Sequence, residues 1–172
     1  MFAPVLALLS GVALANAAGL RSASTSQYGQ SEGDWIVKQV SPDAYVLGGS
    51  VPTPLSVSAV VENGELNIQC PFPGFHAVLV PTADPAKYTV ELVKSNEGLP
   101  EGTIFGGWVT SDDKTGLKNP STTTKVTHEN LGSFDLEVGT NGGVNTLVWK
   151  VQNDEGPSAL FVVLDSANDA SC

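Results

Sequence analysis

Residues 55–69 read Leu-Ser-Val-Ser-Ala-Val-Val-Glu-Asn-Gly-Glu-Leu-Asn-Ile-Gln. Two runs rich in apolar residues flank Asn63 and Gly64, and Asn-Gly is the strongest short signal for a tight β-hairpin because both central residues must take a positive φ. In the second run Leu66 and Ile68 alternate with polar residues, which is the period of a strand with one face on a core. The stretch therefore predicts a β-hairpin.

The same two-residue alternation recurs at 88–92, 134–138 and 147–151. Further strand candidates lie at 35–40, 44–47, 76–80, 104–110, 122–128 and 159–164. The last of these is almost continuously apolar, which is typical of a central strand covered on both faces. About ten or eleven short strands at this spacing predict an all-β fold: an antiparallel, jelly-roll-like β-sandwich, with a closed β-barrel as the alternative.

Composition narrows the class of protein. The chain has 172 residues, a net charge of −10, 15% charged and 41% hydrophobic residues. The apolar content is too high for a disordered polyelectrolyte. Because only 8 residues are Lys or Arg, a basic face for nucleic acid is not expected. Without a linker long enough to mark a boundary, residues 19–172 are expected to form one domain.

Residues 1–18 have the features of a cleaved signal peptide. They carry no charged side chain, and Ala15-Asn16-Ala17 has the small-x-small form that precedes a cleavage site. The run is shorter than the roughly 20 residues that a membrane span needs. A short N-terminal core strand or helix is the alternative. We expect a secreted protein, extracellular or in a cell wall, with no membrane association after processing.

Secretion affects the interpretation of Cys70 and Cys172, the two cysteines of the chain. An oxidising compartment favours a disulfide between them. The bridge would close a loop of about 100 residues and contribute about 4–5 kcal/mol in the chain-entropy model. The alternative, a nucleophilic Cys70 assisted by His76, requires a reducing environment. Two Cys and two His without close paired spacing do not fit a zinc site.

Catalytic motifs are absent from the sequence. It contains no Gly-x-Ser-x-Gly elbow, His-Glu-x-x-His pair, phosphate-binding glycine loop or EF-hand spacing. Only His76 and His128 are of the side-chain type that can act as a base at neutral pH. His128 precedes Glu129, but adjacent residues of a strand point to opposite faces, so the two do not form a suitable catalytic pair. We therefore expect no enzymatic activity, no cofactor and no metal.

A glycoside hydrolase is the main alternative, because a secreted acidic β-protein can place two carboxylates on either side of a sugar bond. Asp135 and Glu137 share one strand face, but they lie opposite apolar residues and so fit a solvent-exposed face. The candidate carboxylates are Asp112, Asp113, Asp135, Glu137, Asp154 and Glu155.

A binding role has support from the large aromatic residues. Trp149 has the alternation of a core residue. Trp108 follows two glycines and precedes Asp112 and Asp113, which places an aromatic ring close to acidic turn residues. Trp108, Asp112 and Asp113 are therefore the ligand-binding candidates, and a core position for Trp108 is the alternative.

Segments near both ends resemble a known family. They are Gly19-Leu20-Arg21-Ser22-Ala23-Ser24, Ala44-Tyr45-Val46-Leu47-Gly48-Gly49, the apolar run 156–165 and the terminal Asp169-Ala170-Ser171-Cys172. These segments are similar to those of the small secreted cell wall proteins of filamentous fungi, the PhiA-like, IgE-binding group. The resemblance implies a fungal, extracellular, non-enzymatic surface protein and transfers no site residue.

Three hypotheses for function follow. The first is a non-catalytic extracellular or cell-wall-associated β-protein, a fungal antigen or effector. The second is a secreted carbohydrate-binding or carbohydrate-active protein that uses acidic residues. The third is a protease inhibitor or host-protein ligand acting through loop 97–102. The partners are thus a wall polysaccharide or a host protein. Since the pI is about 4.4, we also expect wall or self-association to strengthen on acidification.

Overall fold

The computed structural model describes residues 17–26, 29–49, 56–130, 132–138, 145–151 and 160–168. They form fourteen β-strands: β1 (Ala18–Ser26), β2 (Gly29–Asp34), β3 (Ile36–Ser41), β4 (Ala44–Gly49), β5 (Val57–Glu62), β6 (Glu65–Cys70), β7 (Phe75–Pro81), β8 (Lys87–Val93), β9 (Ile104–Phe105), β10 (Trp108–Ser111), β11 (Thr123–His128), β12 (Gly132–Val138), β13 (Asn145–Val151) and β14 (Leu160–Asp165). No described helix is long and apolar enough to cross a membrane.

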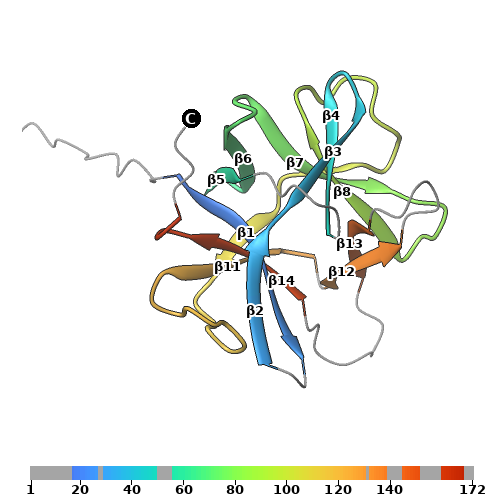
Figure 1. The fold of residues 1–172 in the computed structure, drawn as a ribbon. Coiled ribbons are helices and arrows are strands. Elements are labelled where there is room, and N and C mark those ends of the chain that lie inside the picture. Colours follow the sequence, from blue (N-terminus) through green and yellow to red (C-terminus); the bar gives the residue numbers. More distant parts are fainter. Residues whose placement is uncertain are drawn as a thin grey trace, which may run out of the picture.

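The strands form a closed antiparallel barrel of nine strands, in the order β14-β12-β13-β4-β8-β7-β6-β5-β1 (Figure 1). The predicted β-sandwich is wrong. The sheet closes because β1 pairs with β5 on one edge and with β14 on the other. Closure removes the free sheet edges that a sandwich leaves, which is the physical advantage of a barrel.

Five strands lie outside the closed ring. β2 pairs with β1, β3 with β4, β9 with β7, and the β10–β11 pair joins β14. In Figure 1, β2 extends below the barrel, and β3 lies beside β4 in the upper part of the view. β4 lies between β8 and β13 along only part of their length. β8 pairs with β13 at Lys87–Thr89 and with β4 at Glu91–Val93. The two neighbouring strands therefore diverge along their length, and β4 occupies the space between them.

Side chains fill the barrel interior. Trp35, Trp108 and Trp149 are its largest members and are each 1% exposed. Smaller apolar clusters cover parts of the outer face. On β14, Val162 belongs to the interior core, whereas Val163 packs in an outer cluster with Leu117. The prediction of a strand covered on both faces at 159–164 is thus confirmed.

The opening hairpin is also confirmed. Asn63 and Gly64 have φ values of 53° and 79°, and β5 and β6 pair from Glu62 and Glu65 outward. The expected single strand at 104–110 is two strands, β9 and β10, because Gly106 and Gly107 both take a positive φ and turn the chain. β1 and β2 were not predicted.

Candidate functional site

A pocket lies at one end of the barrel, where β7 and β13 finish and β8 and β12 begin. Its volume is about 330 Å³, at the small end of the range for small-molecule sites. We call it the rim pocket and define it by its lining residues. They are Tyr88, Ile104, Asn130, Trp149 and Val151.

Four separate elements supply these residues. Tyr88 on β8 is the register partner of Trp149 on β13, so the two aromatic residues are neighbours on the inner face of the barrel. Ile104 comes from β9, which pairs with β7 beyond the point where β7 pairs with β6. Asn130 follows the end of β11. The short strand β9 thus extends the barrel wall and completes the pocket.

The lining is apolar with a few polar groups, and none of the five side chains is charged. Trp149 is 1% exposed and forms the buried part of the lining. Tyr88 and Ile104 are half-buried, whereas Asn130 and Val151 are exposed, so a ligand can cover surface on four of the five residues. The Nε1–H of Trp149 is buried and has no acceptor within the described part of the chain. Such a pocket suits an uncharged molecule that combines an apolar face with hydrogen-bonding groups.

Gly132 fits closely against Trp149. A Cβ at position 132 would lie 2.6 Å from both Nε1 and Cε2 of the indole, and it would also meet the carbonyl oxygen of Lys150. Because real Cβ atoms do not approach other atoms this closely, any larger residue has to displace the indole or the backbone. The missing side chain at Gly132 therefore sets the position of the pocket's largest ring.

His128 lies beside the pocket and is 6% exposed. Its ring packs edge-on against Trp108, with centroids 5.4 Å apart, and is 5.9 Å from the ring of Trp149. Nε2 is 2.6 Å from the carbonyl oxygen of Gly106 and donates to it, while Nδ1 accepts the N–H of Asn130 at 3.2 Å. This pattern fixes the neutral ring with its proton on Nε2. Burial lowers the pKa of His128, against smaller opposing effects from the Gly106 hydrogen bond and the Glu129 charge.

The three predicted ligand-binding residues differ in burial. Trp108 is 1% exposed, and its Nε1 donates to the carbonyl oxygen of Ala77 at 2.9 Å, so its ring belongs to the core. Asp112 and Asp113 are exposed. Asp113 Oδ2 lies 2.7 Å from Lys125 Nζ. This hydrogen bond is the main reason that the pKa of Asp113 is well below its usual value.

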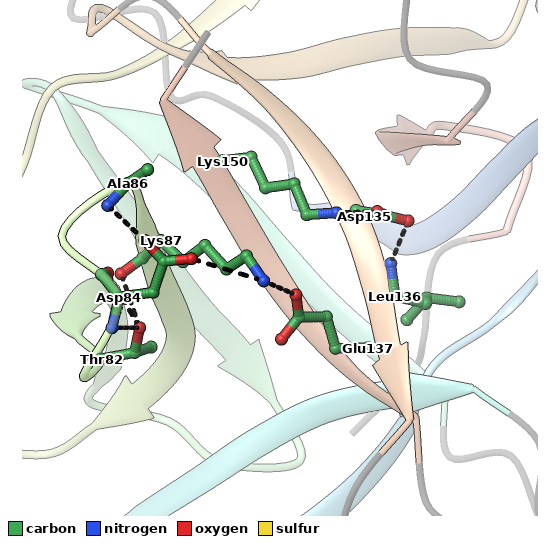
Figure 2. Close-up of polar contacts among 8 residues, drawn as sticks. All are labelled: Thr82, Asp84, Ala86, Lys87, Asp135, Leu136, Glu137 and Lys150. Atoms are coloured by element: carbon green, nitrogen blue, oxygen red, sulfur yellow. Dashed lines mark hydrogen bonds and ion pairs between the residues drawn. The ribbon is translucent and has the colours of Figure 1, made fainter. Parts of the chain in front are cut away.

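Two of the carboxylates considered for hydrolysis, Asp135 and Glu137, are each paired with a lysine. Figure 2 shows Asp135 beside Lys150 and Glu137 beside Lys87. Lys87 Nζ lies 2.5 Å from Glu137 Oε1. Both carboxylates alternate with Phe134 and Leu136 of the interior core and so lie on the outer face of the barrel. Burial raises the pKa of Asp135, but the hydrogen bonds from Lys150 and the Leu136 N–H outweigh it and lower the pKa overall. A general acid needs the opposite shift.

The remaining candidates divide between described and undescribed residues. Asp154, Glu155 and Cys172 lie outside the described residues. Cys70 is buried at the end of β6. Because Cys172 is not among the described residues, the disulfide stays a prediction. His76 Nε2 donates to Asn96 Oδ1 at 2.7 Å. Within the described ranges no three His, Cys, Asp or Glu side chains are grouped to hold a metal ion.

Sequence reasoning missed most of the rim pocket. Tyr88 and Trp149 fit the alternation of core residues, and no motif marks Ile104 or Asn130. The available signal was an aromatic residue near one end of each of two alternating strands. The resemblance to fungal cell wall proteins stays an expectation from the sequence. Comparison with protein-family models, with curated proteins and with solved structures finds no match to this chain.

Proposed function

We propose that this protein is a secreted, non-catalytic binding protein that holds one uncharged sugar ring of a wall polysaccharide in the rim pocket. The observation that carries the proposal is the pair formed by Tyr88 and Trp149, side by side in register on the inner face with the Asn130 side chain close by. A pyranose ring has an apolar C–H face that packs on aromatic and aliphatic groups, and its hydroxyls bond amides.

The polar groups of the pocket suit hydroxyl ligands. The Asn130 amide both donates and accepts hydrogen bonds, and the Trp149 Nε1–H is a donor that lacks an acceptor among the described residues. A hydroxyl can act as donor or acceptor, so it matches the Asn130 amide.

Charge supports a neutral rather than an anionic ligand. The chain carries a net charge of −10 and the pocket lining contains no cation to offset it. Anionic ligands are therefore repelled at neutral pH. Neutral polysaccharides such as chitin and β-glucan are not affected by this repulsion.

A non-catalytic role is supported by the state of the nearby carboxylates. Asp135 and Glu137 lie on the outer face, paired with Lys150 and Lys87 (Figure 2), whereas the side chains of Phe134 and Leu136 between them pack in the interior core. The lining itself supplies no carboxylate. Binding without bond cleavage is the activity that this set of residues supports.

Calorimetric titration with neutral oligosaccharides of chitin and β-glucan tests the proposal. We expect one of them to bind the mature protein, and Tyr88→Ala to weaken binding at least tenfold, which is about 1.4 kcal/mol. Tyr45→Ala is the matched control, because Tyr45 is also half-buried but stacks on Phe72, 4.3 Å away, and does not line the pocket. Absence of binding by every oligosaccharide, or equal binding by folded Tyr88→Ala protein, would contradict the proposal.

A further inference from the structure

We propose that protonation of His128 is an acid switch that breaks the hydrogen bond from the Asn130 N–H to the ring and so alters one wall of the rim pocket. The regulatory meaning of this switch rests on the proposed binding function of that pocket. The switch itself follows from the contacts of His128, which hold a pocket residue through a bond that only the neutral ring can make.

Two hydrogen bonds hold the turn after β11. The Glu129 N–H donates to the carbonyl oxygen of Gly107 at 2.7 Å, and the Asn130 N–H donates to His128 Nδ1 at 3.2 Å. The second bond is the one that reaches a residue of the pocket lining. Its acceptor is a ring nitrogen, so it exists only while Nδ1 carries no proton.

Protonation places a hydrogen on Nδ1, opposite the Asn130 N–H. Two donors then face each other, and the hydrogen bond is replaced by repulsion. The Nε2–H bond to Gly106 survives, because Nε2 already carries a proton in the neutral ring. The ring therefore stays attached on the Gly106 side, and the change falls on the turn that carries Asn130.

The surroundings of the ring disfavour its charge. The segments packed against it present Gly106, Gly107, Trp108 and Trp149, all of which are uncharged. Glu129 is the charged group that acts on the ring. Its charge favours protonation of His128, but burial opposes protonation more strongly. The pKa of His128 therefore lies below the usual 6.5, and the ring is neutral at neutral pH. The hydrogen bond from the Asn130 N–H to His128 is therefore intact at neutral pH and is lost as the medium becomes acidic.

Gly107 supports the same arrangement. It has a φ of +81°, and a Cβ there would lie 2.7 Å from Cε1 of His128. The Gly107 backbone therefore packs closely against the Cε1 and Nε2 atoms of the ring, which limits movement of the ring in that direction. Because the ring is also held at Gly106, we expect loss of the Nδ1 contact to move the turn that carries Asn130.

The switch can be tested without any ligand, by recording ¹H–¹⁵N NMR spectra between about pH 7.5 and about pH 4.5. The backbone amides of Glu129 and Asn130 and the indole N–H of Trp149 should shift together, with one midpoint below 6.5. His128→Gln keeps one donor and one acceptor but does not titrate, so these shifts should vanish. His76→Gln is the matched control, and the shifts should persist in it. Equal shifts in His128→Gln, or none in the wild-type protein, would overturn the proposal.

Direct observation of the His128 ring in the wild-type protein covers the case in which His128→Gln does not fold. Its ¹⁵N shifts should show the Nε2–H tautomer at neutral pH. An Nδ1–H tautomer, or a midpoint at or above 6.5, would overturn the switch.

Titration with the chitin and β-glucan oligosaccharides at both ends of the pH range separates the two proposals. Weaker binding at acidic pH in the wild type, but not in His128→Gln, supports regulation. This effect is confined to the pocket and opposite in sign to the stronger general wall association that the low pI predicts on acidification. Equal binding at both pH values contradicts it. If no oligosaccharide binds, the proposed ligand class is wrong, while the NMR titration still decides whether the switch exists.

Discussion

Arg21 Nη1 donates to Asp165 Oδ2 at 3.0 Å and thereby joins β1 to the end of β14, the two strands that close the barrel. The Asp165 side chain is 1% exposed. It also accepts the Ala167 N–H at 3.0 Å and a hydrogen bond from the Asn168 side chain. Burial raises the pKa of Asp165, but these hydrogen bonds outweigh it and lower the pKa below its usual value. The carboxylate is therefore charged, buried and fully engaged at the closure.

Replacement of Asp165 by alanine should lower the free energy of unfolding by about 3 kcal/mol, because it removes the buried carboxylate beside Arg21 and leaves that residue only its more exposed ion pair with Asp34. Urea denaturation at neutral pH measures the change. Asp112→Asn, at an exposed site, is the control and should change stability by less than about 0.5 kcal/mol. A loss of under about 1 kcal/mol for Asp165→Ala would show that the Arg21 contact does not stabilise the closure.

The sequence-based disulfide leads to a second prediction. Cys172→Ser should lower the free energy of unfolding by about 4–5 kcal/mol, because the unfolded chain loses a loop closure of about 100 residues. Urea denaturation with and without a reductant measures it: the reductant should destabilise the wild type and leave Cys172→Ser unchanged. Free thiols in the denatured wild-type protein would contradict the bridge.

Local patterns in the sequence were sufficient to identify most strands. Asn63 and Gly64 adopt the positive φ values that their hairpin requires. Leu66 and Ile68, chosen by alternation, are both buried in the interior core. These predictions hold because strand period and turn chemistry act over a few neighbouring residues.

Closure of the barrel could not be predicted in the same way. It depends on Leu20, which pairs with Val57 on one side and Leu164 on the other, the second partner lying far along the chain. No local signal distinguishes such pairing from the edge of a sandwich. β1 is also difficult to recognise as a strand from its sequence, because Arg21 and Ser22 interrupt its apolar residues.

The functional site was harder still to predict. Trp108 follows two glycines and precedes Asp112 and Asp113, which made it a ligand-binding candidate with a core position as the alternative. The turn at Gly106 and Gly107 directs its ring inward, where it bonds Ala77. The rim pocket depends on residues from four elements that are separated in the sequence and become neighbours through strand pairing. Sequence spacing alone does not reveal this proximity.

Glu91 gives a third prediction, on pH dependence. It is half-buried on β8, between its register partners Val46 and Val78, and desolvation raises its pKa above 4.5. The folded state therefore binds this proton more tightly than the unfolded state, so the charged carboxylate destabilises the fold at neutral pH and the penalty disappears as pH falls through the folded pKa. Glu91→Gln should stabilise the protein at pH 7, by an amount that shrinks on acidification. Urea denaturation at several pH values measures this, with exposed Glu97→Gln as the control. A destabilised Glu91→Gln at neutral pH would contradict the prediction.

Gly132→Ala gives the last prediction, because it changes the rim pocket without touching a polar group. The added Cβ would lie 2.6 Å from the Trp149 indole and would also meet the Lys150 carbonyl oxygen, which is held in the β12–β13 pairing. Overpacking of this kind costs about 1–3 kcal/mol and should move the indole, with a shift in its NMR signal and loss of oligosaccharide binding. Gly98→Ala is the control: its Cβ meets no atom within 4 Å, and its φ of +77° adds about 1 kcal/mol of backbone strain away from the pocket. It should keep both the indole signal and binding. An unchanged Trp149 signal in folded Gly132→Ala would mean that the indole position does not depend on this glycine.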